Sequence, residues 1–443
     1  MSLNIKNNKF LIPCFIFILA FLPRILVAVA VSNDFTNIPV NDAIGYDDLA
    51  TSISTGKGFA LNGTVTAWRE PLYPGFLATV YFLFGHNYLT VRIIQALLGT
   101  LVCVIVFIIG KTIFDSRIGF ISALITSFNP ALVKISSLLL SENLYILLLA
   151  VSMVILLKYA KKNKLSEIIY LGIFLGLTAL TRSIAIFLPL FIAVIIVRSS
   201  IFESILFKRK ILHIIVFWGV VFLTILPWTL RNWFVFHKFV PLTSRNGMGL
   251  YLSYVPKDGN KFELDPKDPV VIKADAMWES IKSETEQNKF YITETIKHIS
   301  LNPQSLPRIE ALKIIYFCNP FDWEVNNKGE YNFVYGFIMP FFLYSLFFVL
   351  KKERNAFILF VPILYSLFLA LITHGSPRFR LPIEPYLIII SSYGLVYFFQ
   401  GFRHKVYPVI IVLFFLLINL TFSINPEAVK PIIKAILKPL NIV

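Results

Sequence analysis

Long apolar runs, separated by short basic clusters, make up most of this chain. Several runs reach about 20 residues, the length that a helix needs to cross the hydrocarbon core of a bilayer. The runs at 144–157, 168–181 and 184–197 are shorter, but neutral flanks extend them and basic clusters separate them. The pattern predicts about eleven membrane-spanning helices, at residues 10–31, 88–109, 118–137, 144–157, 168–181, 184–197, 211–230, 331–350, 356–373, 383–399 and 406–422.

Two long polar stretches interrupt the apolar runs. In the first, 32–87, residues Asp42, Tyr46 and Leu49 recur at helical spacing and predict an amphipathic helix over 42–54. The apolar segment 71–84 is too short to span, so we expect it to be interfacial or re-entrant. The second stretch, 231–330, has ordinary polarity, and we expect a helix over 269–300.

The pattern therefore divides the chain into three parts. An N-terminal transmembrane module covers 1–230 and contains the polar loop 32–87. A small soluble insertion covers 231–330, and the C-terminal helices with a short tail cover 331–443. With 57% hydrophobic residues, 15% charged residues and a mean hydropathy of +0.73, we expect an all-α polytopic membrane protein.

The charge distribution sets the predicted orientation. The net charge is +16, yet 231–330 holds 13 basic and 13 acidic residues and is neutral. Much of the excess lies in short clusters between apolar runs, which is typical of cytoplasmic loops and not of a nucleic-acid-binding surface. With the N-terminus inside, Arg198 and Arg354 also fall inside. The tail lysines would fall outside, so the helix count near the C-terminus stays open.

The first apolar run has some features of a secretory signal. Basic residues precede it, and Ala28-Val29-Ala30 is similar to a cleavage site. The run is longer than a usual signal core and contains Arg24, so we expect a retained helix. A charged side chain at that depth is costly unless it finds a partner.

The predicted orientation places unusual charged residues on the outer face: Asp42, Asp47, Asp48, Arg69, Glu70, Glu142, Arg182, Arg378 and Arg380. Ionisable groups at membrane depth are expensive and indicate a functional site. A carboxylate can accept the proton of an attacking hydroxyl. Arginines bind a departing phosphate through charge-assisted hydrogen bonds. A lipid-linked sugar phosphate would present such a leaving group at this depth.

Each of these side chains also has a structural interpretation, and the sequence leaves both open. Asp42 can cap the amphipathic helix. Glu142 can be an acid that the dipole of its helix favours, and Arg182, Arg378 and Arg380 can be interfacial anchors. Asp47 and Asp48 point away from the Asp42 face, so we expect them to be solvated.

Five motifs, in order over about 340 residues, carry a family resemblance: 42–50 (DAIGYDDLA), 69–74 (REPLYP), 140–145 (LSENLY), 180–182 (LTR) and 378–382 (RFRLP), with 227–232 (PWTLRN) as a further similarity. With these motifs the chain resembles the GT-C integral-membrane glycosyltransferases. Within them it is most similar to the dolichyl-phosphate-mannose protein mannosyltransferases and the bacterial aminoarabinose transferases of lipid A.

The resemblance implies an enzyme, a hexosyl- or pentosyltransferase. It would take a sugar from a polyprenyl monophosphate and transfer it outside the membrane by inverting, single displacement. By matching position, Asp42 would be the catalytic carboxylate and Glu142 a second acidic group. The remaining expected residues are carrier-phosphate contacts, Arg182, Arg378 and Arg380, and contributors from the loop, Tyr46, Arg69 and Glu70.

One departure from the family pattern concerns metals. Many relatives carry an acidic pair where this chain has Asp42-Ala43, which leaves any divalent-metal requirement open. The three cysteines and six histidines show no metal motif.

We expect no nucleic-acid partner. The expected partners are the sugar donor, a lipid, glycan or protein acceptor, and membrane lipids.

We expect a protein of the bacterial inner (plasma) membrane with its site on the extracytoplasmic side. The alternative function is a lipid or polysaccharide transporter or flippase. Transporters often show internal repeats with sites at mid-depth, whereas this sequence shows no convincing repeat and gathers its polar groups at one face. The third alternative is a non-catalytic membrane scaffold. Such a protein would have no reason to gather carboxylates and arginines on one side.

Overall fold

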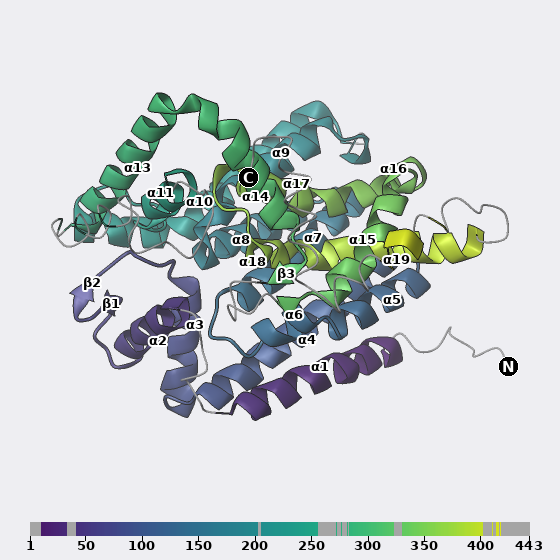
Figure 1. The fold of residues 1–443 in the computed structure, drawn as a ribbon, viewed down its shortest axis with the longest axis horizontal. Coiled ribbons are helices and arrows are strands. Elements are labelled where there is room, and N and C mark those ends of the chain that lie inside the picture. The colour runs from purple at the N-terminus through teal and green to yellow at the C-terminus, as the bar shows by residue number, and fades with distance from the viewer. Residues whose placement is uncertain are drawn as a thin grey trace.

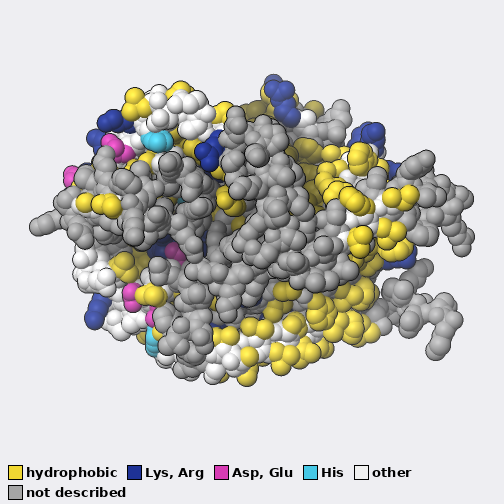
Figure 2. Space-filling model, in the orientation of Figure 1, with side chains coloured by type: hydrophobic (Ala, Val, Ile, Leu, Met, Phe, Trp, Pro, Cys, Tyr) yellow, Lys and Arg dark blue, Asp and Glu magenta, His cyan; other side chains and the backbone are white. Residues whose placement is uncertain are grey.

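The computed structural model describes residues 10–32, 41–202, 205–255, 272, 276, 281, 283–322, 330–401, 410, 413–415 and 417. It is a helical bundle in which α1 and α4 lie side by side, and α2, β1, β2, α11 and α13 gather at the end away from the start of α1 (Figure 1). The acidic side chains visible in Figure 2 lie at that same end, whereas hydrophobic side chains cover the lower edge along α1.

Six helical segments of the described chain are long and apolar enough to cross a membrane: α1 (Leu11–Val31), α4 (Tyr88–Ile113), α7 (Glu142–Lys162), α10 (Phe207–Phe236), η5 with α17 (Arg354–Ile372) and α18 through α19 (Pro377–Gln400). Four shorter segments are also apolar: α3 (Leu72–Phe84), α8 (Leu165–Thr181), η2 with α9 (Ser183–Arg198) and α15 (Phe333–Leu346). The all-α polytopic class predicted from the sequence is confirmed.

The remaining elements connect these helices: α2 (Asn41–Ser54), α5 (Ser116–Ser127), α6 (Pro130–Ile135), η3 (Ser200–Phe202), α11 (Asn246–Tyr254), α13 (Glu284–Leu301), η4 (Pro303–Ser305), α14 (Leu306–Cys318) and α16 (Val349–Lys352). Two antiparallel strand pairs are short: β1 (Ala60–Leu61) with β2 (Thr64–Val65), and β3 (Phe321–Asp322) with β4 (Glu330–Tyr331). The last segment comprises α18 (Pro377–Arg380), η6 (Leu381–Ile383) and α19 (Glu384–Gly401).

Most predicted helices form within a few residues of their expected bounds, but one prediction is wrong. Residues 118–137 do not form a single spanning helix, because α5 ends at Ser127 and α6 begins at Pro130. The Asn129 side chain accepts hydrogen bonds from the amides of Ala131 and Leu132, and so caps the new helix. Of the helix predicted over 269–300, the structure describes α13, and the helix predicted over 406–422 lies almost wholly outside the described residues.

The helix break supplies the partner that Arg24 needs. The guanidinium of Arg24 is buried, and its Nη1 donates to the carbonyls of Ala20 at 2.8 Å and Ser127 at 3.0 Å. Carbonyls at the end of a helix have no partner within the helix. The end of α5 therefore offers acceptors at the depth where α1 places its charge.

Candidate active site

An irregular segment between α6 and α7 positions Glu142. Gln95, on α4, donates its side-chain amide to the carbonyl of Leu138 at 2.8 Å. Arg92, one helical turn earlier, donates to the carbonyl of Ser137 at 2.9 Å. Asn143 in turn donates to the backbone carbonyl of Gln95. These bonds fix the start of α7, so the Glu142 carboxylate is almost fully buried at a set place.

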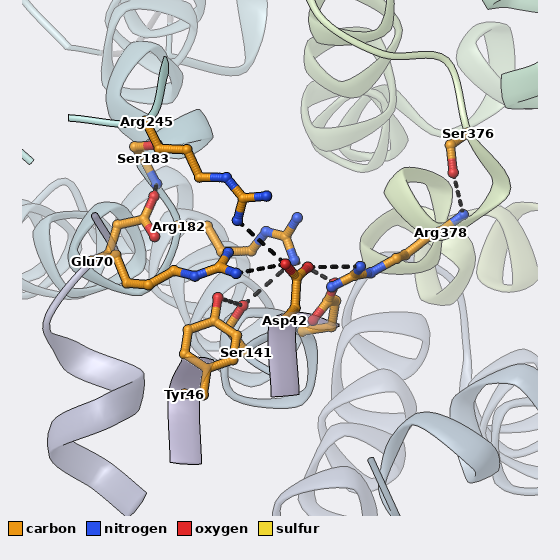
Figure 3. A network of polar contacts seen from close by, with 11 residues as sticks. Asp42, Tyr46, Glu70, Ser141, Arg182, Ser183, Arg245, Ser376 and Arg378 are labelled. Carbon is orange, nitrogen blue, oxygen red and sulfur yellow. Dashed lines mark hydrogen bonds and ion pairs between the residues drawn. The ribbon is translucent and has the colours of Figure 1, made fainter. Parts of the chain in front are cut away.

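Asp42, in the first turn of α2, contacts three arginines. Its Oδ1 lies 2.6 Å from Nη2 of Arg69 and 3.3 Å from Nη1 of Arg245, and its Oδ2 lies 3.0 Å from Nη1 of Arg378. Arg245 and Arg378 reach it from opposite sides (Figure 3). Segments up to 336 residues apart in the chain therefore meet at this carboxylate.

Glu142 extends the same cluster. Its Oε1 lies 2.5 Å from Nη1 of Arg182 and 2.5 Å from Nε of Arg378. Arg378 therefore bridges Glu142 and Asp42 with two different nitrogens. The other oxygen, Oε2 of Glu142, is buried and accepts no hydrogen bond from the described residues. An acceptor atom that is buried and unused is costly, and functional sites are one place where it occurs.

The turn before α18 aims Arg378 at the cluster. The hydroxyl of Ser376 accepts a hydrogen bond from the Arg378 amide at 3.2 Å, and Pro377 occupies the first helical position. At Gly375 the backbone approaches α14 so closely that a Cβ would lie 1.8 Å from the carbonyl oxygen of Lys313. Only glycine allows this approach without a shift of the backbone.

Arg380 does not belong to the cluster, although the sequence placed it beside Arg378. Its Nη1 donates to the carbonyls of Phe317 at 2.8 Å and Asn319 at 2.7 Å, which closes the C-terminal end of α14. Its Nε lies 3.4 Å from the buried Glu384. These contacts indicate a structural role for Arg380.

The two remaining loop residues support their neighbours. Glu70 accepts a hydrogen bond from the Ser183 amide at 2.7 Å and so holds the residue that follows Arg182. Tyr46 is buried, donates to the Ser141 hydroxyl at 3.1 Å and stacks under the guanidinium of Arg69 at 4.9 Å. Both lie at the edge of the cluster and orient its arginines.

Sequence reasoning missed Arg245. It lies at the start of α11, in a polar stretch that carries no motif or unusual hydropathy. Its guanidinium is 5.4 Å from the ring of Trp68 and brings the start of α11 into contact with Asp42. Neither spacing nor hydropathy carries such a signal, because the contact joins positions 203 residues apart.

Comparisons with known proteins bear on the fold of this chain. A family model described as dolichyl-phosphate-mannose-protein mannosyltransferase matches residues 69–228. Oligosaccharyltransferase AglB from Archaeoglobus fulgidus, in complex with an inhibitory peptide and a dolichol-phosphate, is 16% identical with a TM-score of 0.55 over 94% of this chain and 55% of that chain. The apo oligosaccharyltransferase from the same organism is 15% identical with a TM-score of 0.56, over 94% and 55%.

This chain has the GT-C fold. ArnT from Cupriavidus metallidurans bound to undecaprenyl phosphate is also similar, at 13% identity and a TM-score of 0.41, over 96% of this chain and 79% of that chain. No curated protein sequence matches the chain. The chain spans just over half the length of the oligosaccharyltransferase structures. The GT-C resemblance predicted from the sequence motifs is confirmed.

Within this GT-C fold, the arginines determine the charge of Asp42. Burial alone would raise the pKa of its carboxyl, but Arg69, Arg378 and Arg245 outweigh burial and hold the pKa well below 3.8. The carboxylate is therefore ionised at any physiological pH. Among the described residues, no three His, Cys, Asp or Glu side chains gather as a metal site would need.

A pH experiment follows from the low pKa of Asp42. The folded state stabilises the ionised carboxylate, so this contribution is fully present above the unfolded pKa of about 3.9 and is lost as pH falls through the lower folded pKa. We expect thermal unfolding in detergent to show wild type more stable than Asp42→Asn at neutral pH, with the difference shrinking below about pH 4. If the difference in stability between wild type and Asp42→Asn stays constant down to pH 2, the low pKa of Asp42 does not contribute to stability.

Asp47 corrects one prediction. We expected it to be solvated, but it is buried, and its carboxylate accepts hydrogen bonds from Tyr81 at 2.5 Å and Tyr88 at 3.0 Å. His86 lies 2.9 Å from it. Residues of α2, α3 and α4 thereby lock together at one point. Asp48, in contrast, is exposed as predicted.

Glu284, at the start of α13, ties two arginine-bearing loops together. Its carboxylate accepts hydrogen bonds from the Ala67 amide at 3.1 Å, the Thr66 hydroxyl at 3.1 Å and the Ser244 hydroxyl at 2.5 Å. Ala67 lies two residues before Arg69, and Ser244 lies directly before Arg245. The start of α13 therefore holds two loops of the candidate site in place.

We expect Glu284→Gln to destabilise the protein by roughly 1–3 kcal/mol, because an amide has one acceptor oxygen for three donors. Thermal unfolding in detergent measures the change. Glu286→Gln is the matched control, since Glu286 is exposed and makes one ion pair at 3.4 Å with Lys238, a kind of contact worth about 0–1 kcal/mol. If the two variants lower the unfolding temperature by the same amount, the view that Glu284 holds the two loops together is contradicted.

Proposed function

We propose that this chain is a glycosyltransferase that moves a sugar from a polyprenyl-phosphate-linked donor to an extracytoplasmic hydroxyl acceptor, with inversion at the sugar carbon. The observation that carries the proposal is the contact of Asp42 with three arginines, one of which it shares with Glu142. Such an arrangement places a proton acceptor next to groups that bind phosphate.

The charge of the cluster supports an anionic donor. Four guanidiniums, those of Arg69, Arg182, Arg245 and Arg378, surround the two carboxylates of Asp42 and Glu142. The excess is positive even when the nearby Glu70, which accepts a hydrogen bond from a backbone amide, is counted with them. A polyprenyl-phosphate sugar carries one negative charge, and the phosphate gains a second as the sugar leaves. Preorganised guanidiniums stabilise that developing charge.

The transfer is a single displacement. The acceptor oxygen forms a bond to the anomeric carbon while the bond from that carbon to the phosphate oxygen breaks, and its electron pair stays on the phosphate. Asp42 takes the hydroxyl proton, and the guanidiniums of Arg182 and Arg378 hold the leaving phosphate. Attack from the face opposite the leaving group inverts the configuration. The unused Oε2 of Glu142 is placed to accept a hydrogen bond from a substrate hydroxyl.

Donor binding would also prepare the base. With three arginines in contact, Asp42 is a weak proton acceptor, because its pKa is held low. A phosphate that draws one guanidinium away raises that pKa. Arg245 is the most suitable to move, since its contact with Asp42 is the longest of the three at 3.3 Å and its side chain is 34% exposed. The base would then become active only when the donor is present.

A transfer assay tests the proposal. Membranes that carry the protein receive radiolabelled sugars on polyprenyl monophosphate, with the same sugars on polyprenyl diphosphate and on nucleotides as comparison donors. We expect label to reach an acceptor from a monophosphate donor only, with inverted configuration at the new bond. Movement of the intact lipid-linked sugar across the bilayer without transfer would instead indicate a transporter.

A further inference from the structure

A concave site lies toward the opposite end of the helices that lead to the cluster. It is a groove of about 380 Å³ between α9 and the α16–α17 region, lined by Val194, Ile195, Ile201, Leu350 and Phe357, with Ser199 and two arginines, Arg198 and Arg354. Helices α9 and α17 pack against each other, and both lie in the upper right of Figure 1 together with α16. We call this site the α9–α17 groove.

The α9–α17 groove is separate from the candidate active site. Helix α17 has 16 residues and so extends about 24 Å. Arg354 lies just before it, and the chain after it leads to Arg378. Likewise α9 ends at Arg198 and follows directly on η2, which begins after Arg182. The groove and the cluster therefore lie toward opposite ends of the same helices.

The chemistry of the α9–α17 groove matches a phospholipid. Its walls are aliphatic and aromatic, and Val194 and Leu350 are 53% and 41% exposed, as side chains that meet acyl chains are. Arg198 and Arg354 are exposed at its rim, and neither makes an ion pair or side-chain hydrogen bond with the described residues. The predicted orientation places both at the basic, cytoplasmic side. Two guanidiniums above an apolar groove complement an anionic headgroup above an acyl chain.

We propose that the α9–α17 groove binds one anionic phospholipid of the surrounding membrane, with its phosphate between Arg198 and Arg354 and an acyl chain against Val194 and Phe357. The site goes beyond the proposed sugar transfer and does not depend on it. A bound lipid would fill the space between α9 and α17, whose other ends lead to Arg182 and Arg378.

Native mass spectrometry of the purified, delipidated protein in detergent tests the site. The probes are phosphatidylglycerol and phosphatidylcholine with the same acyl chains. We expect wild type to bind phosphatidylglycerol more tightly, by about tenfold or more, and we expect Arg198→Gln with Arg354→Gln to remove that preference. Lys161→Gln with Lys162→Gln is the matched control, because these two lysines are exposed at the end of α7 and do not line the groove.

A third variant tests the groove itself. Val194→Trp fills an exposed position on the wall, so it should weaken the binding of both lipids while thermal unfolding stays close to that of wild type. Equal binding of the two lipids to wild type would overturn the proposal. So would phosphatidylglycerol binding that is unchanged in the double arginine variant, or lost equally in the lysine control.

Discussion

Asp42→Asn is expected to lower kcat/KM for sugar transfer by roughly 10²- to 10⁴-fold, the range that a general base contributes. Asparagine has nearly the same shape and still offers an oxygen to Arg69. It cannot accept the hydroxyl proton, and it no longer neutralises the three arginines. The loss should appear in kcat, because binding of the donor phosphate relies on the guanidiniums and not on this carboxylate.

Radiolabel transfer with wild type and variant in the same membranes measures the effect. Asp48→Asn is the control, since Asp48 lies on the same helix, is exposed and points away from the cluster. Expression level and thermal unfolding in detergent establish that both variants fold. Transfer by Asp42→Asn at the wild-type rate would remove Asp42 from the chemistry, and Glu142 would then be the next carboxylate to test.

Arg378→Lys is expected to lower kcat/KM by about 10²-fold or more, although it keeps the charge. The guanidinium of Arg378 uses Nε for Glu142 and Nη1 for Asp42 at the same time. A lysine ammonium is a single point charge and cannot reproduce this geometry. The lost stabilisation of a developing phosphate charge is typically worth about 10²- to 10³-fold.

Arg245→Lys is the comparison for this experiment. Arg245 makes one contact with Asp42, at 3.3 Å, and is partly exposed, so we expect a smaller loss, carried mainly by KM. Steady-state kinetics with a polyprenyl-phosphate donor separates kcat from KM for both variants. If Arg378→Lys and Arg245→Lys behave alike, the bridge between the two carboxylates has no special part in transfer.

Hydropathy was sufficient to predict most of the fold. Apolar runs with basic ends give α1, α4, α7 and α10 close to their observed bounds, since a bilayer imposes a length and a composition on whatever crosses it. The failure at 118–137 has a local cause. The Asn129-Pro130 pair is short and its neighbours are apolar, so the hydropathy averaged over the run stays high and does not reveal the helix break.

The candidate site was predictable only in part. Asp42, Glu142, Arg182 and Arg378 were predicted because charges are costly in apolar surroundings and because their motifs resemble a family. Arg380 shares a motif with Arg378, but its contacts are made by a different face of the same turn. Arg245 was missed because it lies in ordinary polar sequence, where an arginine does not by itself indicate a functional site.

The buried Arg24 has a consequence for how the chain is assembled in the membrane. Its guanidinium donates hydrogen bonds to the carbonyls of Ser127 and Thr126, residues that the ribosome adds more than 100 positions later. Until then, α1 carries an unshielded charge at a depth where a charge is expensive. We therefore expect the first helix to stay close to the translocation machinery, or tilted toward the interface, until α5 has been inserted beside it. Replacing Arg24 by leucine would free α1 to enter the lipid early and alone.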